Sequence, residues 1–165
     1  MKIGTRARYS LRFMLALGRL SSHAEPVGLG IISRHARISR RYLDQLVVPL
    51  KNASLVRGRS GRGGGYVLAK SPKQIKLRDI IETAIGPIAL TDCVAEPESC
   101  LASDFCKCRD LWALISCRIG EVLDEYTLED MLKQGWPSKV QRELETFEAG
   151  RTPTRLEPAS RTGGG

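Results

Sequence analysis

Apolar residues recur at helical spacing through the first half of the chain and predict its helices before composition is considered. Four stretches place an apolar stripe along one face of a helix: residues 6–20, 29–37, 39–53 and 77–85. In the third stretch Leu43, Leu46 and Leu50 mark the buried face, and Ser39 stands where a hydroxyl can cap the first turn. A tight turn joins the second and third helices, which is the arrangement of a helix-turn-helix.

A glycine-rich segment at residues 60–65 lies between two short β-prone runs, 55–59 and 66–69. Glycine adopts backbone conformations that tight turns require, so the pattern predicts a hairpin with a flexible, positively charged tip. A nucleotide-binding glycine loop is the alternative. Such a loop joins a strand to a helix that carries a Lys-Ser or Lys-Thr pair, whereas these glycines join two strands. A helix-turn-helix followed by a basic hairpin is typical of a winged helix.

Beyond residue 109 the pattern predicts one long helix with a thick apolar side. Its stripe consists of Leu111, Ile115, Ile119, Val122 and Tyr126, with Trp112 and Leu123 beside them. The stripe is too hydrophobic for a lone surface helix and favours packing against the same helix of a second subunit. Packing within the core of one subunit is the alternative. A short helix through residue 133 follows, and the absence of periodicity predicts a disordered tail from about residue 150.

Charge divides the chain at about residue 80. The first 80 residues carry 17 Lys and Arg against three acidic residues, a net charge of +14, and the remainder carries 9 against 15, a net charge of −6. A basic first half is expected to face a polyanion, and the second half is not. No apolar run approaches the length of a membrane span, and Arg12 and Arg19 interrupt the apolar stretch near the N-terminus. We therefore expect a cytoplasmic protein with no membrane contact.

The third helix is the predicted reader of DNA, because the second helix of a helix-turn-helix enters the major groove. Gln45 can pair with adenine, Arg40 or Arg41 with guanine or phosphate, and Asp44 with cytosine. Glycines let the hairpin tip approach the phosphate backbone. The candidate DNA-binding residues are Ser39, Arg40, Arg41, Tyr42, Asp44, Gln45, Arg59, Arg62, Gly63 and Gly64. A charged helix face that is merely solvated is the alternative for the third helix.

Four cysteines lie between the two halves, in a segment rich in Pro, Ser and Asp that predicts neither helix nor strand. They are Cys93, Cys100, Cys106 and Cys108, and a fifth, Cys117, lies within the long helix. The spacing lacks the paired C-x-x-C of a zinc site. An iron-sulfur cluster is larger, so its thiolates can be spread along one loop. Ordinary reduced thiols or a reversible disulfide switch remain the alternative.

The sequence resembles the bacterial winged-helix transcription regulators of the IscR/NsrR (Rrf-two) family over about residues 1–134. The matching pieces are Arg8-Tyr9, the segment 38–46, the end of the wing at 64–69, Gly86-Pro87, the three cysteines, Trp112 and the segment 127–130. The resemblance implies a homodimer that binds a double-stranded DNA operator. It also implies a 2Fe-2S or 4Fe-4S cluster on Cys93, Cys100 and Cys106.

Three positions depart from the family pattern. Members that regulate cluster biogenesis have a histidine where this chain has Arg109, and the nitric-oxide sensors take a ligand from an acidic residue where this chain has Arg8. A protonated arginine cannot ligate a metal. Cys108 is therefore the substitute for the fourth ligand. Ser60 stands where the wing usually has an arginine, so Arg59 or Arg62 is expected to make any minor-groove contact.

These observations predict a mostly α protein with a small β-hairpin wing, in which a winged helix-turn-helix domain precedes a long dimerisation helix. The expected parts are a DNA-binding domain at 1–86, a cluster-binding loop at 87–108, dimerisation and short C-terminal helices at 109–134, and an extension at 135–165. The predicted function is a dimeric repressor controlled by an iron-sulfur cluster that senses cluster status, nitric oxide or redox stress. A cluster-free regulator switched by thiol oxidation or a protein partner is the alternative. Catalysis by the cysteines is not expected, because no histidine or carboxylate beside them suggests a general base.

Overall fold

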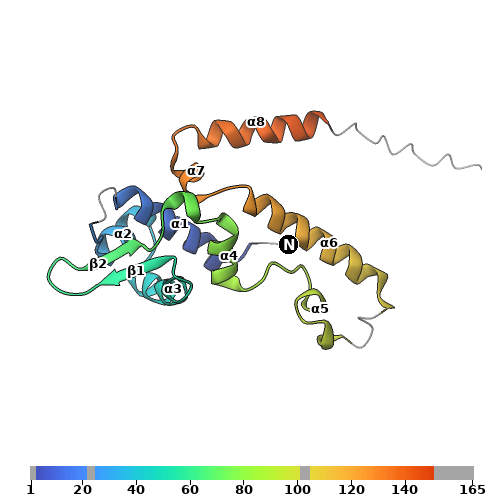
Figure 1. Ribbon diagram of the computed structural model, residues 1–165, viewed down its shortest axis with the longest axis horizontal. Helices are drawn as coiled ribbons and strands as arrows, with labels where there is room; N and C mark the ends of the chain where they lie inside the picture. The colour runs from blue at the N-terminus through green and yellow to red at the C-terminus, as the bar shows by residue number, and fades with distance from the viewer. Residues whose placement is uncertain (1–2, 22–24, 101–104, 151–165) are drawn as a thin grey trace, which may run out of the picture. The chain divides into compact units, whose positions relative to one another are not determined.

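The computed structural model describes residues 3–21, 25–100 and 105–150 (Figure 1). The chain divides into two units, residues 1–133 and residues 134–165, which are described separately below. The tail for which disorder was predicted lies outside the described residues from 151 onward. No helix in the described ranges is both long enough and apolar enough to cross a membrane.

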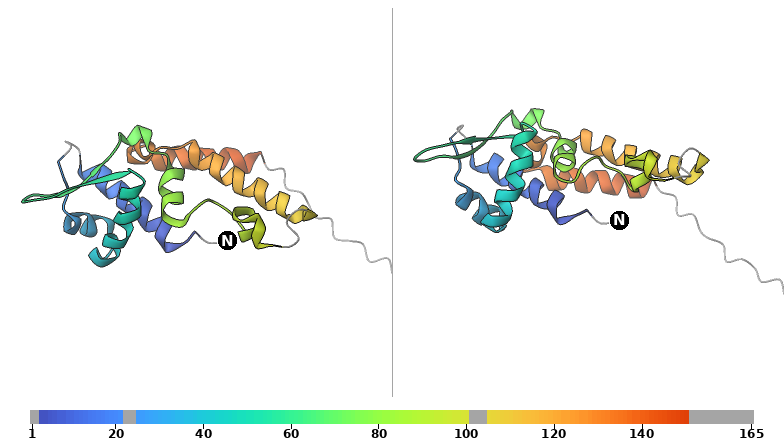
Figure 2. Two further views of the ribbon diagram at one scale, coloured as in Figure 1. Left: turned by 60° about the horizontal axis from the view of Figure 1, so that its bottom comes forward. Right: turned by 90° about the horizontal axis from the view of Figure 1, so that it is seen from below.

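Four helices form the core of the first unit, as the apolar periodicity predicts. They are α1 (Thr5–Leu20), α2 (Leu29–Ala36), α3 (Arg40–Asn52) and α4 (Leu77–Ile85). Helix α1 packs against each of the other three, and the views of Figures 1 and 2 show it running through the middle of this group. Its Phe13, Met14 and Leu17 are fully buried, together with Ile32, Leu43, Leu46, Leu50 and Ile80 from the surrounding helices.

The turn between α2 and α3 is fixed by side chains as well as by backbone. Arg37 ends α2 in the left-handed conformation with a φ of 52°, and Ser33 Oγ donates to the carbonyl oxygen of Ile38 at 2.6 Å. From α1, the guanidinium of Arg12 donates to the carbonyl oxygen of Ala36. The first helix therefore holds the turn that sets the direction of α3.

The predicted hairpin is present as β1 (Val56–Arg59) and β2 (Gly65–Leu68), which pair antiparallel from Val56 opposite Leu68 to Arg59 opposite Gly65. Val27 bridges to Tyr66 and so attaches the hairpin to the segment before α2. A Cβ at Gly65 would lie 2.4 Å from the backbone of Val27, so this close approach requires glycine. The winged helix-turn-helix prediction is confirmed.

The cysteine segment contains more regular structure than the sequence predicts. A one-turn helix α5 (Asp92–Ala95) includes Cys93, a 3₁₀ turn η2 (Pro97–Ser99) precedes Cys100, and α6 (Lys107–Asp124) begins directly after Cys106. Cys108 therefore lies in the first turn of a helix and not in an irregular loop. Helix α6 packs against α4 and α5, and Figure 1 shows its length projecting past α4.

A short 3₁₀ turn η1 (Pro72–Gln74) and helix α7 (Leu128–Leu132) complete the first unit. A reciprocal capping box begins α7: Thr127 Oγ1 accepts from the amide of Asp130, and Asp130 Oδ2 accepts from the amide of Thr127 at 3.0 Å. Hydrogen bonds from the Thr127 hydroxyl and then from its amide lower the pKa of Asp130 from 3.8 to about 2.

We expect Thr127→Ala to lower the free energy of unfolding by about 1 kcal/mol at neutral pH, since the variant loses the cap. The pKa of Asp130 is lower in the folded protein than in the unfolded chain, so its contribution is present above the unfolded value and is lost as the pH falls toward about 2. Urea unfolding of both proteins checks this. The difference between them should be constant from pH 7 to 5 and shrink between about pH 4 and 2.

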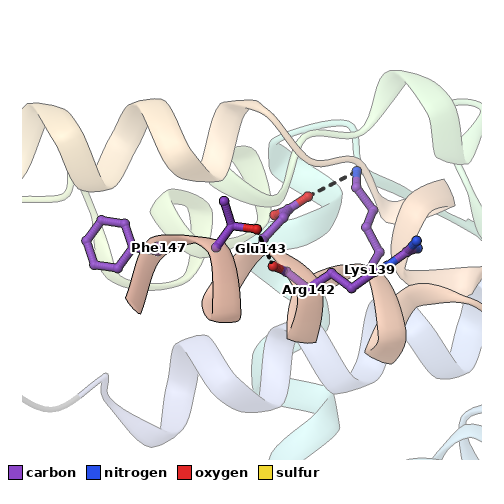
Figure 3. Close-up of a pocket in the computed structure, with 5 residues that line it drawn as sticks. Lys139, Arg142, Glu143 and Phe147 are labelled. Atoms are coloured by element: carbon purple, nitrogen blue, oxygen red, sulfur yellow. Dashed lines mark hydrogen bonds and ion pairs between the residues drawn. The ribbon is translucent and has the colours of Figure 1, made fainter. Parts of the chain in front are cut away.

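The second unit contains α8 (Trp136–Ala149), which the sequence analysis did not predict. Trp136, Val140, Leu144 and Phe147 recur at helical spacing along it. Figure 3 shows a shallow hollow on this helix, where Lys139 pairs with Glu143 at 3.9 Å and Thr146 Oγ1 donates to the carbonyl oxygen of Arg142 at 2.8 Å. The extension is therefore helical as far as residue 149.

Candidate DNA-binding surface and cysteine loop

The first turns of α3 present four of the predicted DNA-contacting side chains to solvent. Arg40, Arg41, Asp44 and Gln45 are all exposed, while the apolar stripe of the same helix is buried against α1, α2 and α4. Ser39 is the N-cap, and its hydroxyl accepts from the amide of Tyr42. The structure thus presents these side chains on one exposed face of a helix whose start is fixed.

Val48 also lies on this exposed face, with more than half of its side chain accessible, and was not among the predicted residues. It follows Gln45 and Asp44 by three and four positions, so it shares their side of the helix. An exposed valine is an apolar group of the kind that can contact the methyl group of a thymine. Val48 lies outside the buried stripe of the predicted helix, and this position in the sequence could have indicated that its side chain is exposed.

Tyr42 is turned toward α1. Its ring meets the ring of Tyr9 edge to face, with centroids 5.5 Å apart, and the guanidinium of Arg12 lies 5.4 Å from the centroid of Tyr9. An aromatic pair in this geometry contributes stabilisation beyond its buried area. The ring of Tyr42 therefore connects α3 to α1.

The predicted residues of the wing lie at the end of β1 and at the tip between the two strands. Arg59 ends β1, while Arg62 and Gly63 lie exposed at the tip between the strands. Gly63 has a φ of 78°, which favours glycine, and a Cβ at Gly64 would lie 2.4 Å from the carbonyl oxygen of Arg59. These glycines are needed to form the tip, whatever they contact.

Arg57 is a basic wing residue that the sequence analysis missed. It is exposed, and it follows the alternation of a strand by lying on the same face of β1 as Arg59. The two arginines line a hollow together with Ser21 at the end of α1 and Val67 of β2. The period-2 spacing of Arg57 and Arg59 in a predicted strand was the available signal.

All five thiols are free in the structure. Cys93, Cys100 and Cys106 are half-buried, on α5, after η2 and at the N-cap of α6, whereas Cys108 and Cys117 are exposed on α6. The three cysteines that the resemblance assigns to a cluster thus share an environment that the other two do not. Residues 101–104, between Cys100 and Cys106, lie outside the described ranges.

The donor set has the chemistry that an iron-sulfur cluster requires, since cysteine thiolates are its usual ligands. Within the described ranges, no three His, Cys, Asp or Glu side chains already converge on a point that could hold a metal ion. The three cysteines are therefore residues of the type that binds an iron-sulfur cluster. Cluster binding would have to bring their thiols closer together.

Side chains from α4 and α6 grip the backbone that leads to Cys93. Glu82 Oε1 accepts from the amide of Ile88 at 3.1 Å, and Ser116 Oγ accepts from the amide of Leu90 at 3.0 Å. Glu82 also pairs with Arg78 at 3.2 Å, and Arg78 reaches Asp124 near the end of α6 at 2.9 Å. These bonds from Asp124 and Glu82 raise the pKa of Arg78. The approach to the cysteines is thereby connected to the helix that packs on α1 and α3.

One side of α6 leaves large apolar side chains exposed. Leu114 and Val122 are 56% and 53% accessible, and Leu111 and Trp112 are exposed beside them, whereas Ser116 and Gly120 face the core. An apolar hollow adjoins this surface between α6, the end of α4 and Ile3, with a volume of about 290 Å³. Of the stripe predicted from the sequence, Leu111, Trp112 and Val122 are exposed, whereas Ile115, Ile119, Leu123 and Tyr126 are half-buried; Leu114 was not among the predicted residues.

Residues 3–134 match a protein family described as an iron-dependent transcriptional regulator, Rrf2 (Rrf-two). The chain belongs to the Rrf2 family. The match covers the winged helix, the cysteine segment, α6 and α7, so the expected family and fold are confirmed.

Individual relatives of this Rrf2-family protein are named transcriptional regulators. The chain is 40% identical to CymR of Bacillus subtilis over 132 residues, covering 79% of this chain and 89% of CymR. It is 32% identical to IscR of Escherichia coli K12 over 155 residues, covering 94% of each. Because the relatives are regulators and none of these names denotes an enzyme, the expectation of a non-enzyme agrees with them.

Solved structures give the same assignment. The structure of CymR, described as the global cysteine regulator of B. subtilis, superposes with a TM-score of 0.64 at 37% identity and covers 80% of this chain and 96% of that one. IscR of T. potens superposes with a TM-score of 0.64 at 30% identity, covering 92% and 93%. An oxidised form of Staphylococcus aureus CymR also matches, with a TM-score of 0.62. This Rrf2-family protein is a DNA-binding transcription regulator.

Proposed function

We propose that this Rrf2-family regulator is a cytoplasmic homodimeric repressor whose operator affinity is controlled by an iron-sulfur cluster. The three half-buried thiols Cys93, Cys100 and Cys106 would hold the cluster, with Cys108 as a further ligand. In this proposal, residues 1–86 read DNA, residues 87–108 bind the cluster and residues 109–134 form the dimer. When bound, a cluster would supply a crosslink that oxygen or nitric oxide can remove.

The segregation of the thiols is the observation that carries the proposal. Three of five cysteines are half-buried within a span of 14 residues, and the other two are exposed on the helix that follows. The name of the family, an iron-dependent regulator, supports the same reading.

The contacts of α4 suggest how the state of the loop would reach DNA. Glu82 holds the backbone at Ile88, while the buried face of α4, at Ile80, Ile81 and Ala84, packs among the core helices. A shift of the loop would therefore pull on a helix that supports α3. In a dimer such a shift changes the separation of two recognition helices, which must match half-sites roughly 34 Å apart.

Anaerobic purification followed by iron and sulfide analysis tests the cluster. We expect a coloured protein whose iron content falls to background in Cys93→Ala and Cys106→Ala and is retained in the matched Cys117→Ala. Retention of the full cluster spectrum by Cys108→Ala would assign the fourth ligand elsewhere. A colourless, iron-free wild-type protein would contradict the cluster.

A cluster-free regulator is the second candidate, and two observations favour it. No three metal-ligating side chains are preassembled in the described ranges. The chain is also similar to CymR of B. subtilis, described as the global cysteine regulator, and to CymR of S. aureus, which has been solved in an oxidised form. In that case thiol oxidation or a protein partner would set DNA affinity. Peroxide treatment of the iron-free protein should then change operator affinity reversibly, and a serine at the oxidised position should abolish the change.

A further inference from the structure

The carbonyl oxygen of Cys93 has no donor within its own helix. In an α-helix this oxygen would accept from the amide four residues later. That residue is Pro97, which has no N–H and which begins the next turn, η2. A half-buried carbonyl left in this way needs a partner from elsewhere.

Arg109 supplies the donor from the first turn of α6. Its Nε lies 2.9 Å from the carbonyl oxygen of Cys93, in a partly buried contact that spans 16 residues of sequence. A hydrogen bond from a charged donor is stronger than a neutral one, and a guanidinium stays protonated at any physiological pH. The Thr91 hydroxyl lies 3.3 Å from Cys93 Sγ, so both the backbone and the thiol of this residue are engaged.

Two further side chains form hydrogen bonds with the backbone of the segment that leads to Cys93. The amide of Ile88 is bound by Glu82 of α4 and the amide of Leu90 by Ser116 of α6. Cys93 is therefore the last of three points at which residues 88–93 are fixed to neighbouring helices. Beyond it, the described structure reaches Cys100 through η2.

We propose that Arg109 is a positioning residue that clamps Cys93 to α6 in the cluster-free protein and contributes no ligand. The importance of Cys93 itself rests on the proposed function, but the clamp does not require a cluster to be present. It holds Cys93 of α5 at a fixed place beside the first turn of α6.

Alkylation of the reduced, iron-free protein tests the clamp. We expect Arg109→Met, which keeps much of the stem and loses the donor, to raise the alkylation rate of Cys93 about tenfold, because opening of the segment no longer costs this bond. Amide exchange of residues 92–96 should accelerate in parallel. Arg109→Lys retains a charged donor and should restore much of the protection. Peptide mass spectrometry reads each thiol separately, and Cys117 should react equally in all three proteins.

Arg118→Met is the matched control, since its guanidinium pairs with Glu121 on its own helix at 2.9 Å. It should leave Cys93 unchanged. Equal protection of Cys93 in wild type and Arg109→Met would overturn the clamp, as would faster reaction of all cysteines together, which would indicate general loosening.

Anaerobic reconstitution separates this inference from the proposed function. If wild type takes up iron, Arg109→Met should retain a cluster with an altered visible circular dichroism spectrum, and Arg109→Lys should return that spectrum toward wild type. Complete loss of iron in Arg109→Lys, with normal folding, would show that Arg109 is more than a clamp. A wild type that binds no iron would contradict the cluster while the alkylation result still decides the clamp.

Discussion

Replacing Leu114 by glutamate should convert the proposed dimer to a monomer and abolish tight operator binding. Leu114 is 56% exposed on the apolar side of α6. In a two-fold dimer the substitution occurs twice at the same interface. The lost apolar burial and the two buried charges should weaken dimerisation by roughly 2 to 4 kcal/mol, about 30-fold to 1000-fold in the dissociation constant.

Sedimentation equilibrium measures the dimer constant, and fluorescence anisotropy with an operator duplex measures binding. A monomer reads one half-site, so operator affinity should fall with the dimer constant. Leu144→Glu is the matched control, because Leu144 is also a half-exposed helical leucine but lies in α8, beyond the family match. An unchanged dimer in Leu114→Glu would assign the subunit contact to another surface.

The helices and strands with a periodic pattern of apolar residues were predictable from the sequence. Helices α1 to α4 follow from apolar spacing, and the wing follows from glycines between two β-prone runs, because both patterns report which side of an element is buried. The apolar stripe of α6 was predicted in part, since Leu111 and Val122 are exposed as expected while exposed Leu114 was not among the predicted residues. In each case the signal lies within one element.

Helix α8 was not predicted, because Gly135 and Pro137 were interpreted only as the end of the short helix that runs through residue 133. Proline is tolerated in the first turn of a helix, where its missing N–H has no partner to lose, and Pro137 occupies that turn. The spacing of Val140, Leu144 and Phe147 was the signal that favours a helix. Pro137 was interpreted as ending one helix, whereas it lies in the first turn of the next helix, α8.

The contact between Arg109 and Cys93 could not be predicted from periodicity, because a side chain reaches a backbone atom 16 residues away. The sequence does indicate that the Cys93 carbonyl needs a partner, because Pro97, four residues later, has no N–H to donate. The resemblance drew attention to Arg109 as a missing ligand. The structure gives it a role of its own, which the ligand pattern of the family would not reveal.

Gln45→Ala should separate reading of bases from binding of phosphates. Gln45 is exposed on α3, between Arg41 and Val48 on the same face, and its amide can pair bidentately with adenine. Loss of that pair should cost about 1 to 3 kcal/mol on the preferred operator, roughly 5-fold to 150-fold in affinity. Binding to random duplex depends on the arginines and should hardly change.

Affinities for the operator and for a random duplex should be compared at one salt concentration. The affinity that phosphate contacts contribute depends on salt, so a constant salt concentration leaves the loss of the base contact as the difference between the two duplexes. Gln141→Ala is the control, since its exposed amide pairs with Glu145 on its own helix at 3.1 Å. Equal losses on operator and random DNA would show that Gln45 reads no base. The specificity would then have to come from Arg40, Arg41 and the wing.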